Sequence, residues 1–495
     1  MTHIIALDQG TSSSRTIIFT AAGQIVCSAQ KEFTQHYPKP GWVEHDAEEI
    51  WNTQLTILQD AVKKSGLKPG DFAAIGITNQ RETLAVWDRK TGKPLHRAIV
   101  WQDRRTADMI AGMRTPALEK SVREKTGLPL DPYFTGTKIK WILENNPDIK
   151  SKAAKGEVCF GTIDAWLLFR LTGGKSFATD ASNASRTLLM NIHKGGWDKE
   201  LTDWIGVSAD SLPEIHANDH AFGETDAAGF RLPVCGMAGD QQSALFGQLC
   251  FEPGDVKNTY GTGCFILAFT GNKAVPSKNN LLTTVAWKLN GKPTEYALEG
   301  SVFVAGAAIQ WLRDGLGLIS SAPEVNPLAE KVQDTDGVYF VPAFTGLGAP
   351  YWNPNARGAI VGLTRGTTSA HIARAALESL ALQSAEVFDA MSADLGKPIR
   401  SIKVDGGACM SDLLMKMQAD FTGCEVVRPK TIETTALGAA LLAALGKGIY
   451  KDRQEMAKAI EHEKTFRPTL SEEARTKKRK AWKKAVATTI HHAQP

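Results

Sequence analysis

Two short apolar runs near the start of the chain flank a polar turn. Residues 4–7 and 16–19 are rich in branched apolar side chains, and DQGTSSSR lies between them. Apolar runs on both sides of a Gly/Ser/Thr segment are typical of a β-hairpin. The pattern returns in residues 256–270, VKNTYGTGCFILAFT, where YGTG occupies the place of QGTS. Because the copies lie about half a chain apart, the pattern predicts two related domains.

Further along, apolar strand-like runs alternate with segments of helical periodicity, as expected for an α/β protein. Asp46 and Glu49 resemble a capping box at the start of a helix, and the Ala/Leu-rich segment 433–444 predicts a core helix. Residues 300–314 also predict a helix, with Gly306 and Gln310 one turn apart on one face. The C-terminal segment 471–490 predicts a docked amphipathic helix with a basic, solvated side.

Polar residues follow several predicted strands at the point where each strand ends. Strand 75–77 is followed by TNQRET, and residues 237–239 are followed by DQQ. Ligands in open α/β sheets bind beyond the carboxyl ends of strands. Arg81 and Glu82 would then donate to and accept from the hydroxyls of a polyol, although a surface ion pair is the alternative. Asp240 is either a general base or an ordinary N-cap.

The first hairpin turn has the composition of a phosphate site. Backbone N–H groups and hydroxyls of Thr11, Ser12 and Ser13 can form an anion-binding nest, and Arg15 adds positive charge. Asp8 ends the preceding strand and is a candidate Mg²⁺ ligand, since this ion takes one or two carboxylates besides phosphate oxygens. The alternative is an ordinary hairpin with a solvated tip.

Composition excludes several classes of protein. The 495 residues are 43% apolar and 22% charged, which is typical of globular domains. Because 57 basic and 53 acidic residues give a net charge of only +4, we expect no nucleic-acid partner. The seven cysteines form no CxxC pair, and no signal sequence or long apolar run is visible. We therefore expect a cytoplasmic protein without a membrane span.

Several motifs resemble a known family. The hairpins at 8–15 and 258–265 resemble the two phosphate hairpins of the actin/hexokinase/Hsp70 superfamily. ITNQRET resembles the fingerprint of the glycerol-phosphorylating branch of the FGGY carbohydrate kinases, and residues 130–143 and 357–382 resemble the two FGGY signatures. The resemblance implies two actin-like (ribonuclease H-like) α/β domains, 1–248 and 249–495, with a nucleotide between them, and a homodimer.

The resemblance also implies a reaction and its residues. ATP with Mg²⁺ would phosphorylate the 3-hydroxyl of glycerol, with Asp240 as general base and Asp8 at the metal. Glycerol would be bound by Asp240 itself and by Arg81, Glu82, Trp101, Tyr133, Gln241 and Phe265. The nucleotide would be bound by Thr11, Ser12, Ser13, Arg15, Thr262, Gly306, Gln310, Ala408 and Asp412.

Some alternatives stay open. Tyr133 can be a core aromatic at a helix start, and Asp412 stands near a position where the family usually has Asn. An FGGY kinase for another polyol or sugar is the nearer alternative for the whole chain. The remote one is an actin- or Hsp70-like ATPase without a small acceptor, which should lack the ITNQRET and GDQQ polar cluster.

Overall fold

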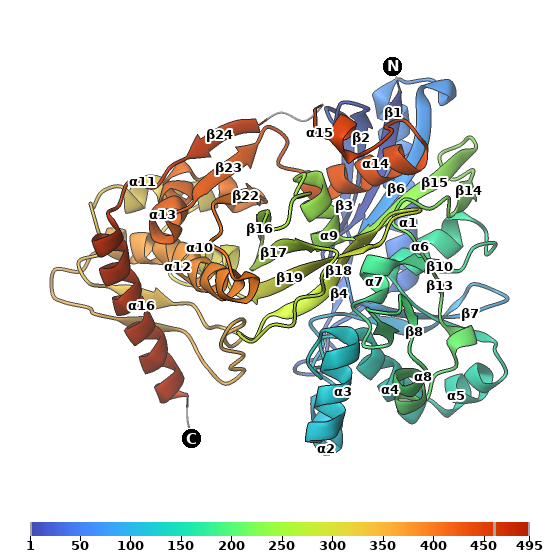
Figure 1. The fold of residues 1–495 in the computed structure, drawn as a ribbon, viewed down its shortest axis with the longest axis horizontal. Helices are drawn as coiled ribbons and strands as arrows, with labels where there is room; N and C mark the ends of the chain where they lie inside the picture. Colours follow the sequence, from blue (N-terminus) through green and yellow to red (C-terminus); the bar gives the residue numbers. More distant parts are fainter. Residues whose placement is uncertain (1, 459–461, 494–495) are drawn as a thin grey trace.

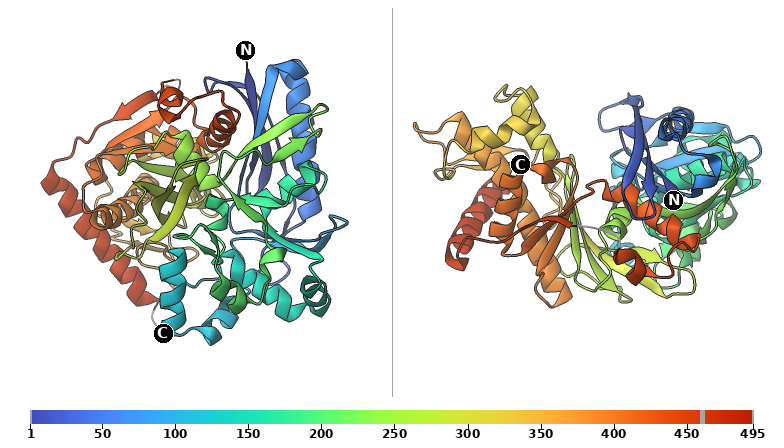
Figure 2. Two further views of the ribbon diagram at one scale, coloured as in Figure 1. Left: turned by 45° about the vertical axis from the view of Figure 1, so that its right-hand side comes forward. Right: turned by 90° about the horizontal axis from the view of Figure 1, so that it is seen from above.

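The computed structural model describes residues 2–458 and 462–493. The chain forms two lobes, each built around a mixed β-sheet (Figure 1). Figure 2 shows the blue and cyan elements of the first half gathered in one lobe and most of the yellow and orange elements in the other.

The sheet of the first lobe places the N-terminal hairpin beside two parallel strands. Its order is β14-β15-β6-β1-β2-β3, with β1 antiparallel to β2 and parallel to β6, and β6 parallel to β15. The carboxyl ends of β1, β6 and β15 therefore meet at one edge. The strands are β1 His3–Gln9, β2 Ser13–Thr20, β3 Ile25–Glu32, β6 Phe72–Asn79, β14 Gly223–Thr225 and β15 Leu232–Gly239.

The second lobe repeats this arrangement. Its sheet has the order β18-β19-β17-β16-β22-β23-β24, so β19-β17-β16-β22-β23 matches β3-β2-β1-β6-β15 in order and direction. The predicted repeat is confirmed as a repeat of the whole sheet. The strands are β16 Val256–Tyr260, β17 Cys264–Gly271, β18 Leu282–Lys288, β19 Thr294–Val302, β22 Ser401–Asp405, β23 Glu425–Pro429 and β24 His462–Phe466.

An antiparallel sheet, β4-β5-β8-β7-β9, extends the first lobe. It consists of β4 Gln35–His36, β5 Glu44–His45, β7 Leu84–Asp88, β8 Pro94–Ile99 and β9 Val158–Thr162. Three two-stranded pairs complete the strands: β10 Ala178–Asp180 with β13 Glu214–His216, β11 Met190–Asn191 with β12 Gly196–Trp197, and β20 Tyr339–Val341 with β21 Ala359–Val361.

The helices of the first half are α1 Ala47–Ser65, α2 Ala107–Met113, α3 Pro116–Thr126, α4 Thr135–Asn145, α5 Pro147–Ala154, α6 Ile163–Leu171, α7 Ala181–Ala184, α8 Lys199–Ile205 and α9 Asp240–Gly247. Those of the second half are α10 Gly306–Asp314, α11 Val325–Ala329, α12 Ser369–Leu395, α13 Asp412–Thr422, α14 Thr434–Gly446, α15 Arg453–Ala457 and α16 Glu472–His492. Asp46 caps α1 as predicted, but Glu49 instead accepts bonds from Thr34.

The first sheet is buried on both faces. Successive apolar residues of its strands belong alternately to a core on one face and a core on the other. Ile5 and Leu7 belong to the core that contains α1, whereas Ile4 and Ala6 belong to the core that contains α14. Helix α14 comes late in the sequence, yet it packs against α9, β15, β6 and β1 (Figure 1). The contact is close, since a Cβ atom at Gly76 of β6 would lie 2.1 Å from the carbonyl oxygen of Ala439.

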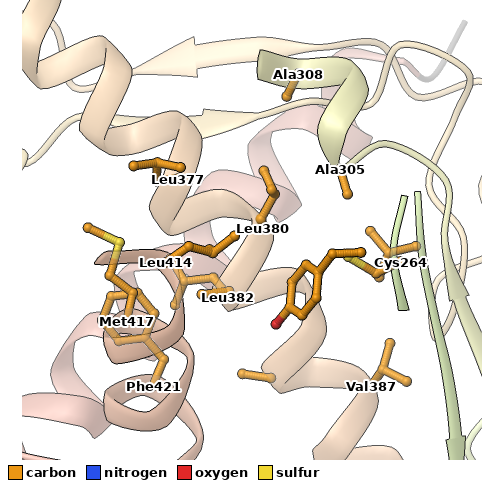
Figure 3. Packing of buried hydrophobic residues seen from close by; sticks show 14 of the residues in the cluster. Cys264, Ala305, Ala308, Leu377, Leu380, Leu382, Val387, Leu414, Met417 and Phe421 are labelled. Carbon is orange, nitrogen blue, oxygen red and sulfur yellow. The ribbon is translucent and has the colours of Figure 1, made fainter. Parts of the chain in front are cut away.

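The core of the second lobe lies between its sheet and α12 and α13. Figure 3 shows Leu380 and Leu382 of α12 near Leu414 of α13, with Cys264 of β17 on the opposite side. The C-terminal helix α16 docks on this lobe as predicted. Trp482 and Val486 are buried, and the Trp482 indole N–H donates to Glu386 at 2.9 Å.

The helix predicted over 300–314 is wrong in its first part. Residues up to Val302 belong to β19, which pairs with β17, and α10 begins only at Gly306. Strand pairing and burial override helical periodicity here, because Ser301 and Val302 are both buried between neighbouring strands and the core. Among the described residues, no helix is both long and apolar enough to span a membrane.

Candidate active site

Polar side chains from both lobes meet at the edge where β1, β6 and β15 end. Asp8 lies near the end of β1, Arg81 follows β6, and Asp240 is the first residue of α9, directly after β15. The N-cap of α9 is Gly239, so the alternative role of Asp240 as an N-cap is excluded. The Asp240 side chain is 30% exposed, which leaves it accessible to a ligand.

Arg81 is buried and joins the two lobes. Its Nη1 and Nη2 atoms lie 2.6 and 2.9 Å from the two carboxylate oxygens of Glu299 on β19, a bidentate pair. Its Nε atom lies 3.2 Å from Asp240 Oδ1. Arg81 is thereby held in one orientation, with one edge directed to Glu299 and the other to Asp240.

Glu82 is buried beside Arg81 but has a different main partner. Its Oε1 atom accepts a bond from Arg186 Nε at 2.6 Å, while Arg81 Nε is 3.8 Å away. Arg186 Nη2 also donates to Glu299 at 3.1 Å. The alternative of a surface ion pair between Arg81 and Glu82 is therefore excluded. Both residues belong to a buried cluster of two arginines and two glutamates.

The charges of this cluster shift one another's pKa values. Burial alone would raise the pKa of Glu299, but Arg186 and Arg81 together lower it to about 2. Burial raises the pKa of Glu82 despite the opposing effect of the same arginines. The pKa of Arg81 lies well above its usual value because Glu299 and Glu82 outweigh the cost of burial. Arg81 therefore stays charged.

Three aromatic side chains form one wall of the site. The Trp101 ring lies edge-on to Tyr133 and Phe265, with centroids 5.7 and 6.2 Å apart. Trp101 Nε1 donates to the Thr11 hydroxyl at 2.9 Å, which connects the wall to the first phosphate turn. Tyr133 also packs against the neighbouring Phe134 ring, as expected for an aromatic residue at a helix start.

Gln241 and a buried lysine lie beneath Asp240. Gln241 Nε2 donates to Asp240 Oδ2 at 3.1 Å, and Gln241 Oε1 accepts a bond from Lys257 Nζ at 2.5 Å. Lys257 belongs to β16 and is fully buried. Burial lowers the pKa of Lys257 to about 8, although Asp405 and Asp240 oppose the shift.

The first hairpin turn is a tight loop closed by a backbone hydrogen bond. The Gly10 N–H donates to the Ser13 carbonyl at 3.0 Å, and Ser12 at the tip is exposed. Arg15 forms an ion pair with Glu433, the residue before α14. Burial raises the pKa of the Asp8 carboxyl to about 7, Arg15 opposes the shift, and Glu433 and Asp240 add to it. A cation would relieve this local excess of negative charge.

The second hairpin turn is joined to the start of α10. The backbone N–H of Gly306 donates to the Gly261 carbonyl at 3.0 Å, and that of Ala307 donates to the Thr262 carbonyl at 3.2 Å. The first N–H groups of α10 therefore bind the protein itself. Thr262 and Gln310 are exposed, so their side chains are accessible to a nucleotide.

Ala408 and Asp412 lie together after β22. Ala408 is half-buried in a short 3₁₀ turn, Gly407–Met410, and Ser411 caps α13 by accepting the Leu414 N–H. The Asp412 carboxylate is 3.0 Å from Arg428 and 2.5 Å from Lys464. Because the side chains of Arg428 and Lys464 already bind this carboxylate, a nucleotide bound by Asp412 would have to share the carboxylate with them.

Four charged residues of the site were not predicted from the sequence: Glu299, Arg186, Lys257 and Glu433. A detectable signal existed for one of them. Lys257 is the single charged residue of its buried strand, and it stands where the first copy of the repeat has Ala6. Isolated charges in a buried strand require partners, so they mark polar sites.

A groove on the second lobe lies away from this site. It has a volume of about 400 Å³ and is lined by residues of α12 and α16, including Glu386 and Lys483. The Glu386 carboxylate already accepts bonds from Tyr351 at 2.5 Å and Trp482 at 2.9 Å. The groove therefore adds nothing to the chemistry of the site.

Comparison with known proteins gives matches over nearly the whole chain. The model of the N-terminal domain of the FGGY family of carbohydrate kinases matches residues 3–247, and that of the C-terminal domain matches residues 256–446. A glycerol kinase of Deinococcus radiodurans is 56% identical, with 98% of this chain and 97% of the relative covered. A glycerol kinase of Trichlorobacter lovleyi is also 56% identical, and both chains are covered completely.

Solved structures give the same result. The crystal structure of Plasmodium falciparum glycerol kinase with ADP has a TM-score of 0.92 and 37% identity, and covers 99% of this chain and 98% of its own. A xylulose kinase from Lactobacillus acidophilus has a TM-score of 0.86 at 23% identity, with coverages of 99% and 97%. The second likeness concerns the fold alone.

Proposed function

The chain belongs to the FGGY family of carbohydrate kinases, and we propose that it transfers the γ-phosphate of ATP to the 3-hydroxyl of glycerol, forming sn-glycerol 3-phosphate. Full-length relatives named glycerol kinase support this substrate. The observation that carries the proposal is the Asp240 carboxylate, which is partly exposed and held at both oxygens by Arg81 and Gln241.

Glycerol carries hydroxyls on a short carbon chain. The site offers charged side chains for the hydroxyls and aromatic side chains for the carbon chain. Arg81 and Glu82 would bind two hydroxyls, since one can donate and the other can accept. Trp101 and Phe265 would contact the carbon chain, and Tyr133 lies beside Trp101. Buried polar groups that pair with hydroxyls reject an analogue lacking them, because the groups would be left unpaired.

Asp240 would accept the proton of the attacking hydroxyl. Phosphoryl transfer passes through a loose transition state, so the reaction depends mainly on positioning and charge stabilisation. Arg81 Nε and the Gln241 backbone N–H, 3.2 and 2.8 Å from Asp240 Oδ1, fix the carboxylate. Orientation of this kind contributes about 7–11 kcal/mol in favourable systems.

ATP would bind between the two hairpin turns. Thr11, Ser12, Ser13 and Arg15 would contact phosphate oxygens from one side and Thr262 from the other. The adenosine would lie against Gly306, Gln310, Ala408 and Asp412. Asp8 is a suitable ligand for Mg²⁺, which when bound neutralises charge on the phosphate oxygens. Burial, together with the nearby Glu433 and Asp240 carboxylates, raises the Asp8 pKa, and a bound cation would favour the ionised form of Asp8.

Assembly and location follow the family resemblance. We expect a cytoplasmic homodimer, with the lobes divided near residue 248. Analytical ultracentrifugation at working concentration measures the dimer directly.

Glycerol-dependent release of ADP tests the function. Purified protein with Mg·ATP should release ADP only when glycerol is added, and more efficiently than with xylulose or gluconate. Asp240→Asn should lower kcat by roughly 10²- to 10⁴-fold, because the base is lost, while glycerol still binds in calorimetry. Higher kcat/KM for another polyol would support the nearer alternative, and ADP release without any acceptor would support an ATPase.

A further inference from the structure

Lys257 is fully buried beneath the site and uses all of its donors on the protein. Its Nζ atom donates to Gln241 Oε1 at 2.5 Å, to the Thr259 hydroxyl at 2.8 Å and to the Phe265 carbonyl at 3.2 Å. An ammonium group has three N–H donors. Lys257 therefore has no donor left for a phosphate, and its role must act through these neighbours.

The contact with Lys257 fixes which way the Gln241 amide faces. An ammonium group only donates, so the amide oxygen must face Lys257 and the amide nitrogen must face Asp240 Oδ2, 3.1 Å away. A flipped amide would place N–H groups against the ammonium and its oxygen against the carboxylate. The lysine thus determines that Gln241 donates to Asp240.

We propose that Lys257 is a positioning residue, which acts through the Gln241 amide to hold the Asp240 carboxylate in the orientation needed to accept the proton of the alcohol. This rests on the proposed function of Asp240. The contact spans the two lobes, since Lys257 lies on β16 and Gln241 on α9. The first hairpin has Ala6 at the matching position, so only the second carries such a group.

The charges around Lys257 support a protonated, positioning lysine. Asp405 on β22 and Asp240 on α9 favour its charge, Glu299 on β19 adds to them, and Arg81 opposes. Because burial lowers the pKa of Lys257 to about 8, the ammonium is present below that pH and is lost above it. Activity that depends on the ammonium should fall as the pH rises through this value.

A double-mutant cycle tests the proposal. Lys257→Met keeps the apolar stem and should lower kcat by roughly 10- to 100-fold through misplacement of the base, with little change in the KM for ATP. Gln241→Met should have a similar effect. Because both act through one contact, Lys257→Met in the Gln241→Met background should change kcat by less than about threefold.

The matched control is a second buried lysine. Lys138 is also fully buried, but it donates to the carbonyls of Pro132 and Tyr133 at 3.0 and 2.6 Å. Lys138→Met should raise the KM for glycerol through Tyr133. Its effect should be the same in the Gln241→Met background as in the wild-type protein. The control shows what the loss of a buried ammonium does without the Gln241 contact.

The pH profile gives a readout that needs no lysine variant. In the wild-type protein kcat should fall above a pH of about 8, and in Gln241→Met it should stay flat over the same range. The proposal would be overturned if the effects of Lys257→Met and Gln241→Met on kcat multiplied in the double variant and if the wild-type and Gln241→Met proteins had the same pH profile. A wild-type protein that releases no ADP with glycerol would instead overturn the proposed function.

Discussion

Arg81 is a proposed glycerol ligand and is also part of a buried ion-pair cluster. Its bidentate contact with Glu299 is buried, and the carboxylate is shared with Arg186. A buried ion pair adds little net stability, but removing one partner leaves an uncompensated charge. Arg81 therefore cannot be removed without an effect on the fold, whatever its effect on glycerol.

Arg81→Ala is expected to lower the free energy of unfolding by about 3–5 kcal/mol and to weaken glycerol binding. Arg81→Ala with Glu299→Gln should recover part of the stability, because the carboxylate charge that lacks its partner is gone, but none of the affinity. Urea unfolding and glycerol calorimetry measure the two effects separately. Equal stability of the single and double variants would contradict the explanation.

Residues of the site could be predicted where polar groups follow a strand end. Arg81 and Asp240 were found in this way, because the position beyond a strand is visible in the sequence. Glu299 was not predicted, because Arg81, the residue with which its charge pairs, lies 218 residues earlier in the chain. No local pattern connects Glu299 with a partner so distant in the sequence, and folding alone brings the two side chains together.

At the scale of elements, α14 depends on small residues at its contacts. A Cβ atom at Gly438 would lie 1.8 Å from the carbonyl oxygen of Ser243 on α9. Both backbones therefore approach more closely than any other residue would allow. The sequence predicted a core helix here, but not which sheet it covers, since an Ala/Leu-rich helix is apolar on every side.

Gly438→Ala should destabilise the protein by about 1–3 kcal/mol or more, because the added methyl group forces α14 away from α9. The control is Gly112→Ala on exposed α2, where nothing lies within 4 Å of the new Cβ atom. That change should be neutral or stabilise by up to about 1 kcal/mol, since Ala has the higher helix propensity. Thermal unfolding followed by circular dichroism compares them. Similar effects of both changes would argue against tight packing of α14.

At the scale of the molecule, contacts between the halves are numerous and chemically varied. Arg81 pairs with Glu299, Arg15 with Glu433, Lys257 with Gln241, and α14 packs on the first sheet. The repeat in the sequence predicted two lobes, and the strand orders confirm it. The division near residue 248 stays a prediction, and α14 lies beyond it in sequence but beside the first sheet in space.

We expect the protein to unfold in one cooperative transition, because one face of each large sheet is buried in a core that residues of both halves share. Differential scanning calorimetry should give equal calorimetric and van't Hoff enthalpies. The control is the Gly438→Ala variant, in which a weakened contact with α14 should broaden or split the transition. Two separate transitions in the wild-type protein would contradict the expectation.

The late position of α14 also has a consequence for synthesis on the ribosome. The last strand of the first sheet that α14 contacts ends at Gly239, and α14 ends at Gly446, about 200 residues later. At about 5–20 residues per second, roughly 10–40 s pass before the helix emerges. During that time α14 does not yet cover the sheet face with Ile4 and Ala6. The nascent chain therefore exposes an apolar surface until α14 has been made. A chain left incomplete before that point by a stalled ribosome is prone to aggregate.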